Sequence, residues 1–251
     1  MDEFAMRPIG WVRTCYPEKF GVPRQAGMAG SARGRLVFAP DYGCKEAVEG
    51  LEGFSHVWVV FVFHEVRAEE VRLRVRPPRL GGNERLGVFA TRSPFRPNRI
   101  GLSACRLDRV GVSGTGGAVL DLSGVDLVDG TPVLDVKPYL SWADAVGAAA
   151  GGFAANGPES LEVEVTPEAR RDFEALPEDL RELVRDTLRW DARPAYHEEG
   201  RRYFTRIMDA EAAWEVRGRT CLVVGVATKG KAEGKARPDE PGSDSGCNKG
   251  G

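Results

Sequence analysis

The stretch FSHVWVVFVF at residues 54–63 is the apolar segment around which the fold is organised. Its β-branched and aromatic residues are typical of a β-strand, and both of its faces are apolar. We therefore expect a central strand of a sheet or barrel. Polarity begins directly after it at His64 and Glu65, and a strand end that opens on a loop is a natural place for a site. For His64, a hydrogen-bonded residue at the rim of the sheet is the alternative.

Similar short segments on both sides of this stretch predict a mainly β fold. Six to eight strands separated by turn residues, with one weak helix at residues 45–51, are typical of an all-β barrel or sandwich. No GxGxxG motif opens a helix after a strand, which disfavours a nucleotide site of the Rossmann type. The other strands expected here are residues 9–14, 31–38, 71–75, 87–90, 101–112, 118–125 and 133–139.

The composition divides the chain into two units. Residues 7–142 carry the strand pattern and are predicted to form the barrel domain. Residues 143–158 are rich in Ala and Gly and are interpreted as a linker, and residues 159–228 predict a small α+β domain. The tail, residues 229–251, is rich in Lys, Gly, Glu, Pro, Asp and Ser and is predicted to be disordered.

Two helices are expected in the small domain. Thr166 followed by Pro167 is a typical helix start. The second helix follows Pro177 and repeats its apolar residues with helical spacing, which predicts one buried face. These apolar residues are Leu180, Leu183, Val184 and Leu188.

The overall composition is that of a soluble globular protein. Of the 251 residues, 42% are hydrophobic and 29% charged, and the longest apolar run is too short to span a membrane. The first ten residues lack the basic and apolar regions of a secretion signal. The five cysteines are scattered without CxxC spacing, which argues for reduced thiols in a cytoplasm and against a disulfide framework or zinc site. With only three histidines, no metal centre is expected.

Positive charge is concentrated between Arg67 and Arg106. This block holds ten arginines, no lysine and three acids, a net charge of +7, so that the rest of the chain carries −2 − 7 = −9. Such a basic block in an acidic protein is a candidate surface for phosphate groups. The alternative is that individual arginines pair with the acids elsewhere in the chain.

Five stretches of the sequence resemble one family, the tRNA N6-threonylcarbamoyladenosine methyltransferases, also called the TsaA-like or TrmO-like family. They are KFGVPRQAG (19–27), EGLEGFSHVWVVFVFHE (49–65), VRPPRLGGNERLGVFATRSPFRPNRIGLS (75–103), DLVDGTPVLDVKPY (126–139) and LRWDARPAY (188–196). The resemblance implies a single-sheeted β-barrel methyltransferase that uses S-adenosyl-L-methionine. It further implies a homodimer that methylates threonylcarbamoyladenosine beside the tRNA anticodon, with a C-terminal unit that helps tRNA binding.

The same resemblance implies where the cofactor binds. The family's contacts fall on one turn, one strand end, two single residues and a second turn, and they comprise Pro23, Arg24, Gln25, His64, Glu65, Arg92, Leu102, Asp126, Leu127, Val128 and Asp129. One departure is Glu65, where relatives are expected to carry Gln. Its carboxylate adds negative charge, which could favour a cationic sulfonium.

The residue types suit these roles. The guanidinium of Arg24 or Arg92 could bind the cofactor carboxylate through its planar fork. Asp126 and Asp129 could accept hydrogen bonds from amino or ribose hydroxyl groups, while Leu102 and Val128 would offer the adenine an apolar wall. The alternative for the two aspartates is simple turn formation, since Asp-Gly at 129–130 makes a good turn by itself.

The methyl transfer implied by the resemblance needs no nucleophilic residue of the protein, but a general base would assist it. Methyl transfer from a sulfonium is a displacement in which positioning supplies much of the rate. The acylated acceptor nitrogen is a poor nucleophile, so a group that takes its proton would help. Asp129, His64 and Glu65 are the candidates, and the residues alone do not rank them.

Four arginines are predicted to contact RNA phosphates or the cofactor rim, namely Arg79, Arg85, Arg96 and Arg99. They lie among Pro and Gly in the basic block, where Ser93 and Asn98 are expected to cap turns. Two other classes of protein remain open: a non-catalytic RNA-binding β-barrel, and an S-adenosylmethionine-dependent methyltransferase of another RNA or a small molecule.

Overall fold

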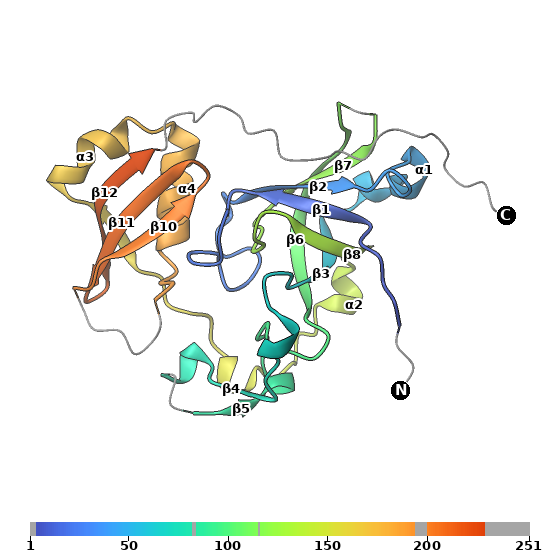
Figure 1. Ribbon diagram of the computed structural model, residues 1–251, viewed down its shortest axis with the longest axis horizontal. Coiled ribbons are helices and arrows are strands. Elements are labelled where there is room, and N and C mark those ends of the chain that lie inside the picture. The colour runs from blue at the N-terminus through green and yellow to red at the C-terminus, as the bar shows by residue number, and fades with distance from the viewer. Residues whose placement is uncertain (1–3, 82–83, 115, 194–199, 229–251) are drawn as a thin grey trace.

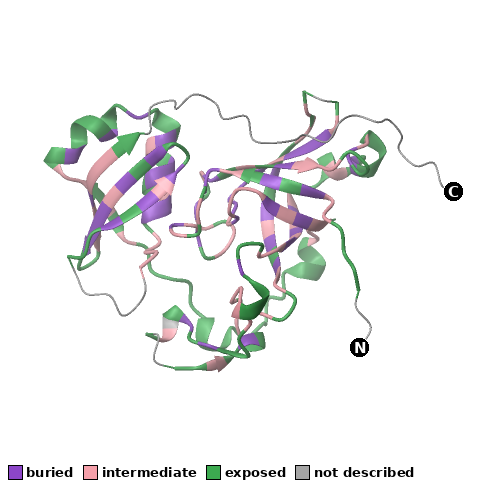
Figure 2. Cartoon of the chain, viewed as in Figure 1, coloured by how far each residue is buried: buried purple, intermediate pink, exposed green. Residues whose placement is uncertain are grey.

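The computed structural model describes residues 4–81, 84–114, 116–193 and 200–228. Figure 1 shows a barrel beside a smaller unit in which two helices accompany a sheet, and a long connection that projects away from the barrel. In Figure 2, buried residues alternate with less buried ones along the strands of both units, and the projecting connection is mostly exposed or half-buried. Residues 229–251, which were predicted to be disordered, lie outside the described residues.

Six strands close into a barrel in the order β1-β2-β7-β6-β3-β8, with antiparallel neighbours throughout. They are β1 (Gly10–Thr14), β2 (Arg33–Phe38), β3 (His56–Val62), β6 (Ile100–Val112), β7 (Ala118–Ser123) and β8 (Thr131–Pro138). The predicted mainly β class is confirmed. The pairing of β1 with β8 closes the sheet, so the fold is a barrel and not a sandwich.

The apolar stretch that opened the sequence forms β3, which pairs with both β6 and β8 and is therefore central as predicted. Val57, Val59 and Phe61 are buried in the barrel, whereas the alternate residues are only half-buried, because a barrel has a single interior. Gly101 lies opposite Phe61 in β6, and a side chain there would overlap the phenylalanine ring. Glycine is therefore required for this close approach.

Three connections open at the same end of the barrel. β1 ends where β2 begins, β3 ends where β6 begins, and the turn after β7 leads into β8 beside β1. We call residues 15–31, between β1 and β2, the strap, and residues 64–99, between β3 and β6, the arm. The third connection is the turn at residues 124–130. Among the described residues, the opposite end of the barrel carries the segment that enters β1, α1 (Lys45–Val48), the 3-10 turn η1 (Leu51–Gly53) and the chain leading to the smaller unit.

The arm contains a small sheet of its own, formed by β4 (Arg74–Val75) and β5 (Leu86–Gly87). Of the strand predicted at residues 71–75, only Arg74–Val75 is a strand, and the strand predicted at residues 87–90 is wrong beyond Gly87, because residues 88–90 form a 3-10 turn. The arm contains the 3-10 turns η2 (Ala68–Glu70), η3 (Pro78–Leu80) and η4 (Val88–Ala90).

The smaller unit has the predicted α+β composition. Its four-stranded sheet has the order β10-β11-β12-β9, with β9 parallel to β12 and the other pairs antiparallel. The apolar residues predicted for the second helix are buried. The elements are β9 (Glu162–Val165), α3 (Pro167–Glu174), α4 (Glu178–Leu188), β10 (Tyr203–Ile207), β11 (Ala210–Arg217) and β12 (Thr220–Thr228). Between the two units the chain forms α2 (Ser141–Asp144) and the 3-10 turn η5 (Gly152–Ala154).

Within the part of the chain that the structure describes, none of the helices combines the length and the apolar character needed to cross a bilayer.

Candidate active site

The strap and the arm meet at Gln25 and Arg92. A guanidinium N–H of Arg92 donates to Oε1 of Gln25, and the side-chain amide of Gln25 in turn donates to the carbonyl of Arg24. Arg92 is exposed and Gln25 is half-buried, so this contact lies at the surface where the two connections come together. Two predicted cofactor residues that are 67 positions apart are therefore in direct contact.

Asp126 lies close to this junction. Burial raises the pKa of its carboxyl to about 6, against the opposing effects of the Ser103 hydroxyl, the backbone N–H groups of Ala26 and Asp126 itself, and the Arg92 charge. Its Oδ1 atom is shielded from solvent and has no hydrogen-bond partner among the described residues. A buried carboxylate oxygen without a donor is energetically costly, so this atom is a natural acceptor for an N–H or O–H of a ligand.

Asp129 has a different environment, although it belongs to the same turn. Its Oδ1 accepts a hydrogen bond from the backbone N–H of Thr14 at 3.1 Å, and its Oδ2 lies 3.8 Å from a guanidinium nitrogen of Arg13. Its own N–H donates to the carbonyl of Tyr16 at 2.8 Å. These contacts tie the turn to β1, which favours the turn-forming alternative for Asp129.

His64 and Glu65 are both exposed at the end of β3, as predicted. The Lys19 ammonium donates to the backbone carbonyl of Glu65 at 2.6 Å and lies 3.6 Å from its carboxylate. Glu65 therefore faces a cation from the strap. The negative charge that distinguishes this chain from the expected Gln is partly offset by Lys19.

The predicted apolar residues divide between the surface and the core. Leu102 is 53% exposed on β6 and Val128 is half-buried, so both can offer an apolar wall. Leu127 is buried in the core and its carbonyl accepts from the Thr14 hydroxyl at 2.9 Å, so its side chain faces the protein. Pro23 is buried, whereas Arg24 is exposed and its guanidinium donates to the Arg193 carbonyl at 3.1 Å.

The predicted RNA-binding arginines have unequal surroundings. Arg85 is exposed, whereas Arg96 donates to the Thr91 carbonyl at 3.3 Å and Arg99 to the Val66 carbonyl at 2.6 Å. Arg99 also has a backbone φ of 53°, in the left-handed region. Arg96 and Arg99 therefore brace the arm from within. The side chain of Arg79 lies outside the described part of the structure.

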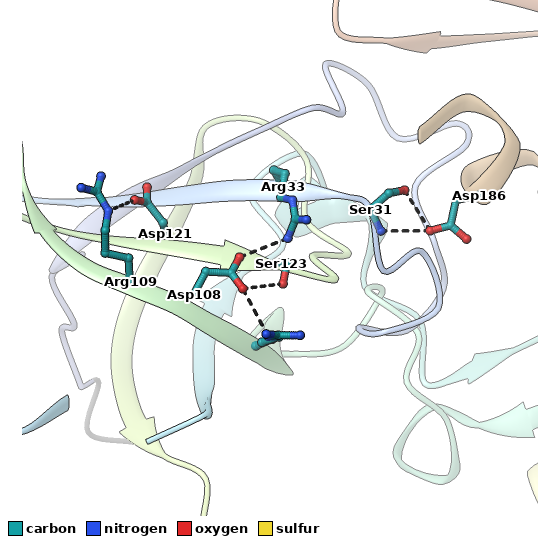
Figure 3. Close-up of polar contacts among 8 residues, drawn as sticks. Ser31, Arg33, Asp108, Arg109, Asp121, Ser123 and Asp186 are labelled. Carbon is teal, nitrogen blue, oxygen red and sulfur yellow. Dashed lines mark hydrogen bonds and ion pairs between the residues drawn. The ribbon is translucent and has the colours of Figure 1, made fainter. Parts of the chain in front are cut away.

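Other arginines on the barrel wall pair with acids. Asp108 interacts with Arg33 at 3.2 Å and with Arg106 at 3.3 Å, and Figure 3 shows the Arg33 and Ser123 contacts of this carboxylate. Arg106 closes the basic block, so the alternative of pairing with acids holds for this residue. The second such group, also in Figure 3, joins Asp121 to Arg109.

Sequence reasoning missed Ser103 and Ala26 as neighbours of Asp126. Ser103 alternates with exposed Leu102 in β6, and that alternation is the only signal that its hydroxyl points inward. Ala26 takes part through its backbone N–H, which the sequence does not distinguish from any other. Among the residues that the structure describes, no group of His, Cys, Asp or Glu is arranged to hold a metal ion.

Comparison with known proteins gives consistent matches along the chain. The tRNA-methyltransferase O N-terminal domain matches residues 11–145, and the TrmO C-terminal domain matches residues 158–229. A Pseudomonas aeruginosa protein, RcsF, described as a candidate S-adenosylmethionine-dependent methyltransferase, is 48% identical over 216 residues, which cover 84% of this chain and 91% of that protein.

Two further relatives agree. The tRNA (adenine(37)-N6)-methyltransferase of Escherichia coli is 44% identical over 223 residues, which cover 86% of this chain and 94% of that enzyme. The crystal structure of TrmO from Pseudomonas aeruginosa matches with a TM-score of 0.74 and 41% identity, over 90% of this chain and 99% of that one. The chain therefore belongs to the tRNA-methyltransferase O family.

Proposed function

We propose that the protein is a cytoplasmic tRNA (adenine-N6)-methyltransferase that uses S-adenosyl-L-methionine and acts on threonylcarbamoyladenosine next to the anticodon. The observation that carries the proposal is the shielded carboxylate oxygen of Asp126, which has no hydrogen-bond partner within the described residues and lies beside the Arg92–Gln25 contact. In a family whose relatives are named tRNA (adenine(37)-N6)-methyltransferases, this arrangement supports a ligand site at the expected place.

The side chains at the junction fit the polar groups of the cofactor. Asp126 offers an acceptor to an amino or hydroxyl group, and the exposed guanidinium of Arg92 or Arg24 suits a carboxylate. The exposed face of Leu102 suits an adenine ring. When bound, S-adenosyl-L-methionine supplies an electrophilic methyl group on a sulfonium.

The protein's own contribution is to orient the reactants and to accept a proton. Asp129 is engaged by Thr14 and Arg13, and Glu65 faces Lys19. His64 is exposed at the end of β3 and is therefore the candidate base that an incoming acceptor can approach. We assign the proton-accepting role to His64, with Glu65 as the second candidate.

The proposal includes a homodimer. Large apolar side chains such as Trp142 and Phe89 are exposed, at 84% and 73%, and a second copy of the chain would cover such surface. Sedimentation of the purified protein tests this part separately, and a monomer at micromolar concentration would exclude it.

The decisive experiment is mass spectrometry of nucleosides after threonylcarbamoylated tRNA has been incubated with the protein and S-adenosyl-L-methionine. We expect one methyl group to be added to the threonylcarbamoyladenosine, and none with unmodified tRNA. Methylation of the unmodified tRNA instead would indicate another substrate. A folded protein that fails to bind the cofactor in calorimetry would favour the non-catalytic RNA-binding barrel.

A further inference from the structure

One side of the strap is attached to the C-terminal unit by hydrogen bonds. Asp186 of α4 accepts from both the N–H and the hydroxyl of Ser31, at 3.0 and 2.9 Å (Figure 3). The indole N–H of Trp190, just beyond α4, donates to the Met28 carbonyl at 2.6 Å. Further contacts of the same kind join Tyr16 to Thr187 at 3.1 Å, Arg24 to the Arg193 carbonyl at 3.1 Å, and the Met208 N–H to the Cys15 carbonyl at 2.7 Å.

Apolar side chains also pack between the strap and the C-terminal unit. The ring of Phe20 stacks against Tyr203 and Trp214 of the C-terminal sheet, with centroid distances of 6.0 and 6.2 Å. Gly21 lies so close to Thr205 that a side chain at the glycine would overlap it. The strap is therefore packed on the C-terminal unit from its beginning to its end.

The other side of the strap faces the candidate cofactor site. Gln25 contacts Arg92, and the Ala26 N–H interacts with Asp126. The Gly27 N–H donates to the Gly124 carbonyl at 2.8 Å, which holds the strap against the turn that carries Asp126. Residues 24–28 thus touch the site through some atoms and the C-terminal unit through others.

We propose that the C-terminal unit positions the strap for cofactor binding, with Asp186 and Trp190 as the positioning residues. This inference rests on the proposed function of the site, and it gives the unit a role beyond the help in tRNA binding that the family resemblance implies. A connection of this length without regular structure has high conformational entropy when it is not attached. Attachment to the C-terminal unit lowers the ordering cost that cofactor binding would otherwise have to offset.

The test is calorimetric titration of the full-length protein with S-adenosyl-L-methionine. For Asp186→Ala, which removes the Oδ2 atom that accepts both hydrogen bonds from Ser31, we expect the dissociation constant to rise about tenfold. Asp186→Asn keeps one carbonyl oxygen as an acceptor and should restore affinity to within about twofold of wild type. Glu182→Ala, at an exposed position of the same helix, is the matched control and should bind as the wild type does.

Enzyme kinetics separate positioning from a general loss of structure. For Asp186→Ala we expect KM for the cofactor to rise while kcat at saturating cofactor and the affinity for tRNA alone change less than about twofold. If Asp186→Ala does not fold, Trp190→Phe takes its place, because it keeps an aromatic ring, although a smaller one, and loses the N–H donor, and it should weaken cofactor binding about threefold.

The outcomes are distinguishable. Wild-type protein that binds no cofactor would overturn the proposed function itself. Wild-type protein that binds and methylates, together with folded variants of unchanged cofactor affinity, would overturn only the positioning role. A parallel loss of cofactor and tRNA affinity with a lower melting temperature would do the same, since it would indicate a purely structural contact.

Discussion

The strap and the arm are two connections at the same end of one barrel, and they are held in opposite ways. The contacts of the strap reach residues far away in the sequence, such as Asp186 and Trp190. The contacts of the arm are mostly with the arm itself: the Arg99 side chain binds the Val66 carbonyl, and the Arg74 side chain binds the Arg85 carbonyl at 3.3 Å. The strap therefore takes its conformation from the C-terminal unit, whereas the arm is braced by its own arginines.

This difference indicates which of the two connections holds the candidate site more firmly. Phe20 of the strap is packed in an aromatic cluster, while Phe89 of the arm is 73% exposed. Segments with few buried contacts open at lower free energy than packed ones, so we expect the arm to be the more easily opened connection. The Arg92–Gln25 contact joins this arm to the better-held strap.

The largest expected effect concerns Asp126 beneath the junction. Its folded-state pKa of about 6 lies above the ordinary value of 3.8, so the native state binds more protons than the unfolded chain between these values. The free energy of unfolding should therefore fall as the pH rises through this window, and remain reduced above about pH 6. The side chain of Asp126→Asn cannot titrate. The free energy of unfolding of this variant should therefore exceed that of the wild type above pH 6 by on the order of 3 kcal/mol, and the two values should converge near pH 4.

Urea unfolding from pH 4 to 8 measures this effect, with Asp209→Asn as a control at an exposed carboxylate. If the stability of the wild type and of Asp126→Asn changes with pH in parallel, the pKa of Asp126 is not raised in the folded protein.

The next effect compares the same substitution in the two connections. Phe20→Ala removes the ring that stacks on Tyr203 and Trp214 and should lower the free energy of unfolding by about 2 kcal/mol, less than for a fully buried phenylalanine. Phe89→Ala in the arm should change it by less than about 0.5 kcal/mol. Denaturant titration of both variants is the measurement, and equal losses would remove the distinction between strap and arm.

The contact between the connections should have a smaller effect, seen in ligand affinity. Arg92→Ala should weaken S-adenosyl-L-methionine binding about tenfold, because it removes a charged donor near Asp126. Arg92→Lys keeps the charge without the planar fork, and its cofactor affinity should lie between those of the wild type and Arg92→Ala. Arg85→Ala, an exposed arginine of the same arm, should leave cofactor affinity unchanged in calorimetry. A loss with Arg85→Ala as large as with Arg92→Ala would indicate a nonspecific charge effect.

The smallest effect is the salt dependence of tRNA binding. Arg85→Ala should reduce the slope of log affinity against log salt concentration by about one, as expected for one lost phosphate contact. Arg96→Ala should weaken binding and flatten the slope in the same way. Because Arg96 also braces the arm through Thr91, its variant should in addition lower the melting temperature by a few degrees. Binding that is unchanged across a salt series would exclude the arginine concerned from the RNA interface.

The mainly β class was predictable because β3 and β6 carry long β-branched and alternating patterns. The strand pattern alone left barrel and sandwich open; the family resemblance implied a barrel, and the pairing of β1 with β8 across the whole domain confirms it. For the site, the two aspartates of the 124–130 turn show in the same way that the sequence does not reveal which contacts a residue makes. Both are plausible ligands in sequence, but Asp129 is engaged by Thr14, while Asp126 retains a shielded oxygen that no described residue partners.

The sequence predicted a shared role for the arginines of the basic block, but not the contact that each arginine makes. A cluster of positive charge is visible in composition, but the partner of each guanidinium depends on which carbonyl the folded backbone places within reach. Arg96 and Arg99 find carbonyls of their own arm, and Arg106 finds Asp108 on the barrel wall. Arg85 is one of several exposed arginines among the described residues of the block, and salt-dependent tRNA binding tests its predicted RNA contact.

The strand-forming segments, the helices of the C-terminal unit and the family resemblance can be read from the amino-acid sequence, because they depend on local propensity, periodicity and continuous motifs. Only the folded chain shows that the strap lies between the C-terminal unit and the candidate site, and that Gln25 meets Arg92 close to Asp126. Contacts between residues more than 60 positions apart arise from barrel closure and packing of the two units, which no local pattern encodes.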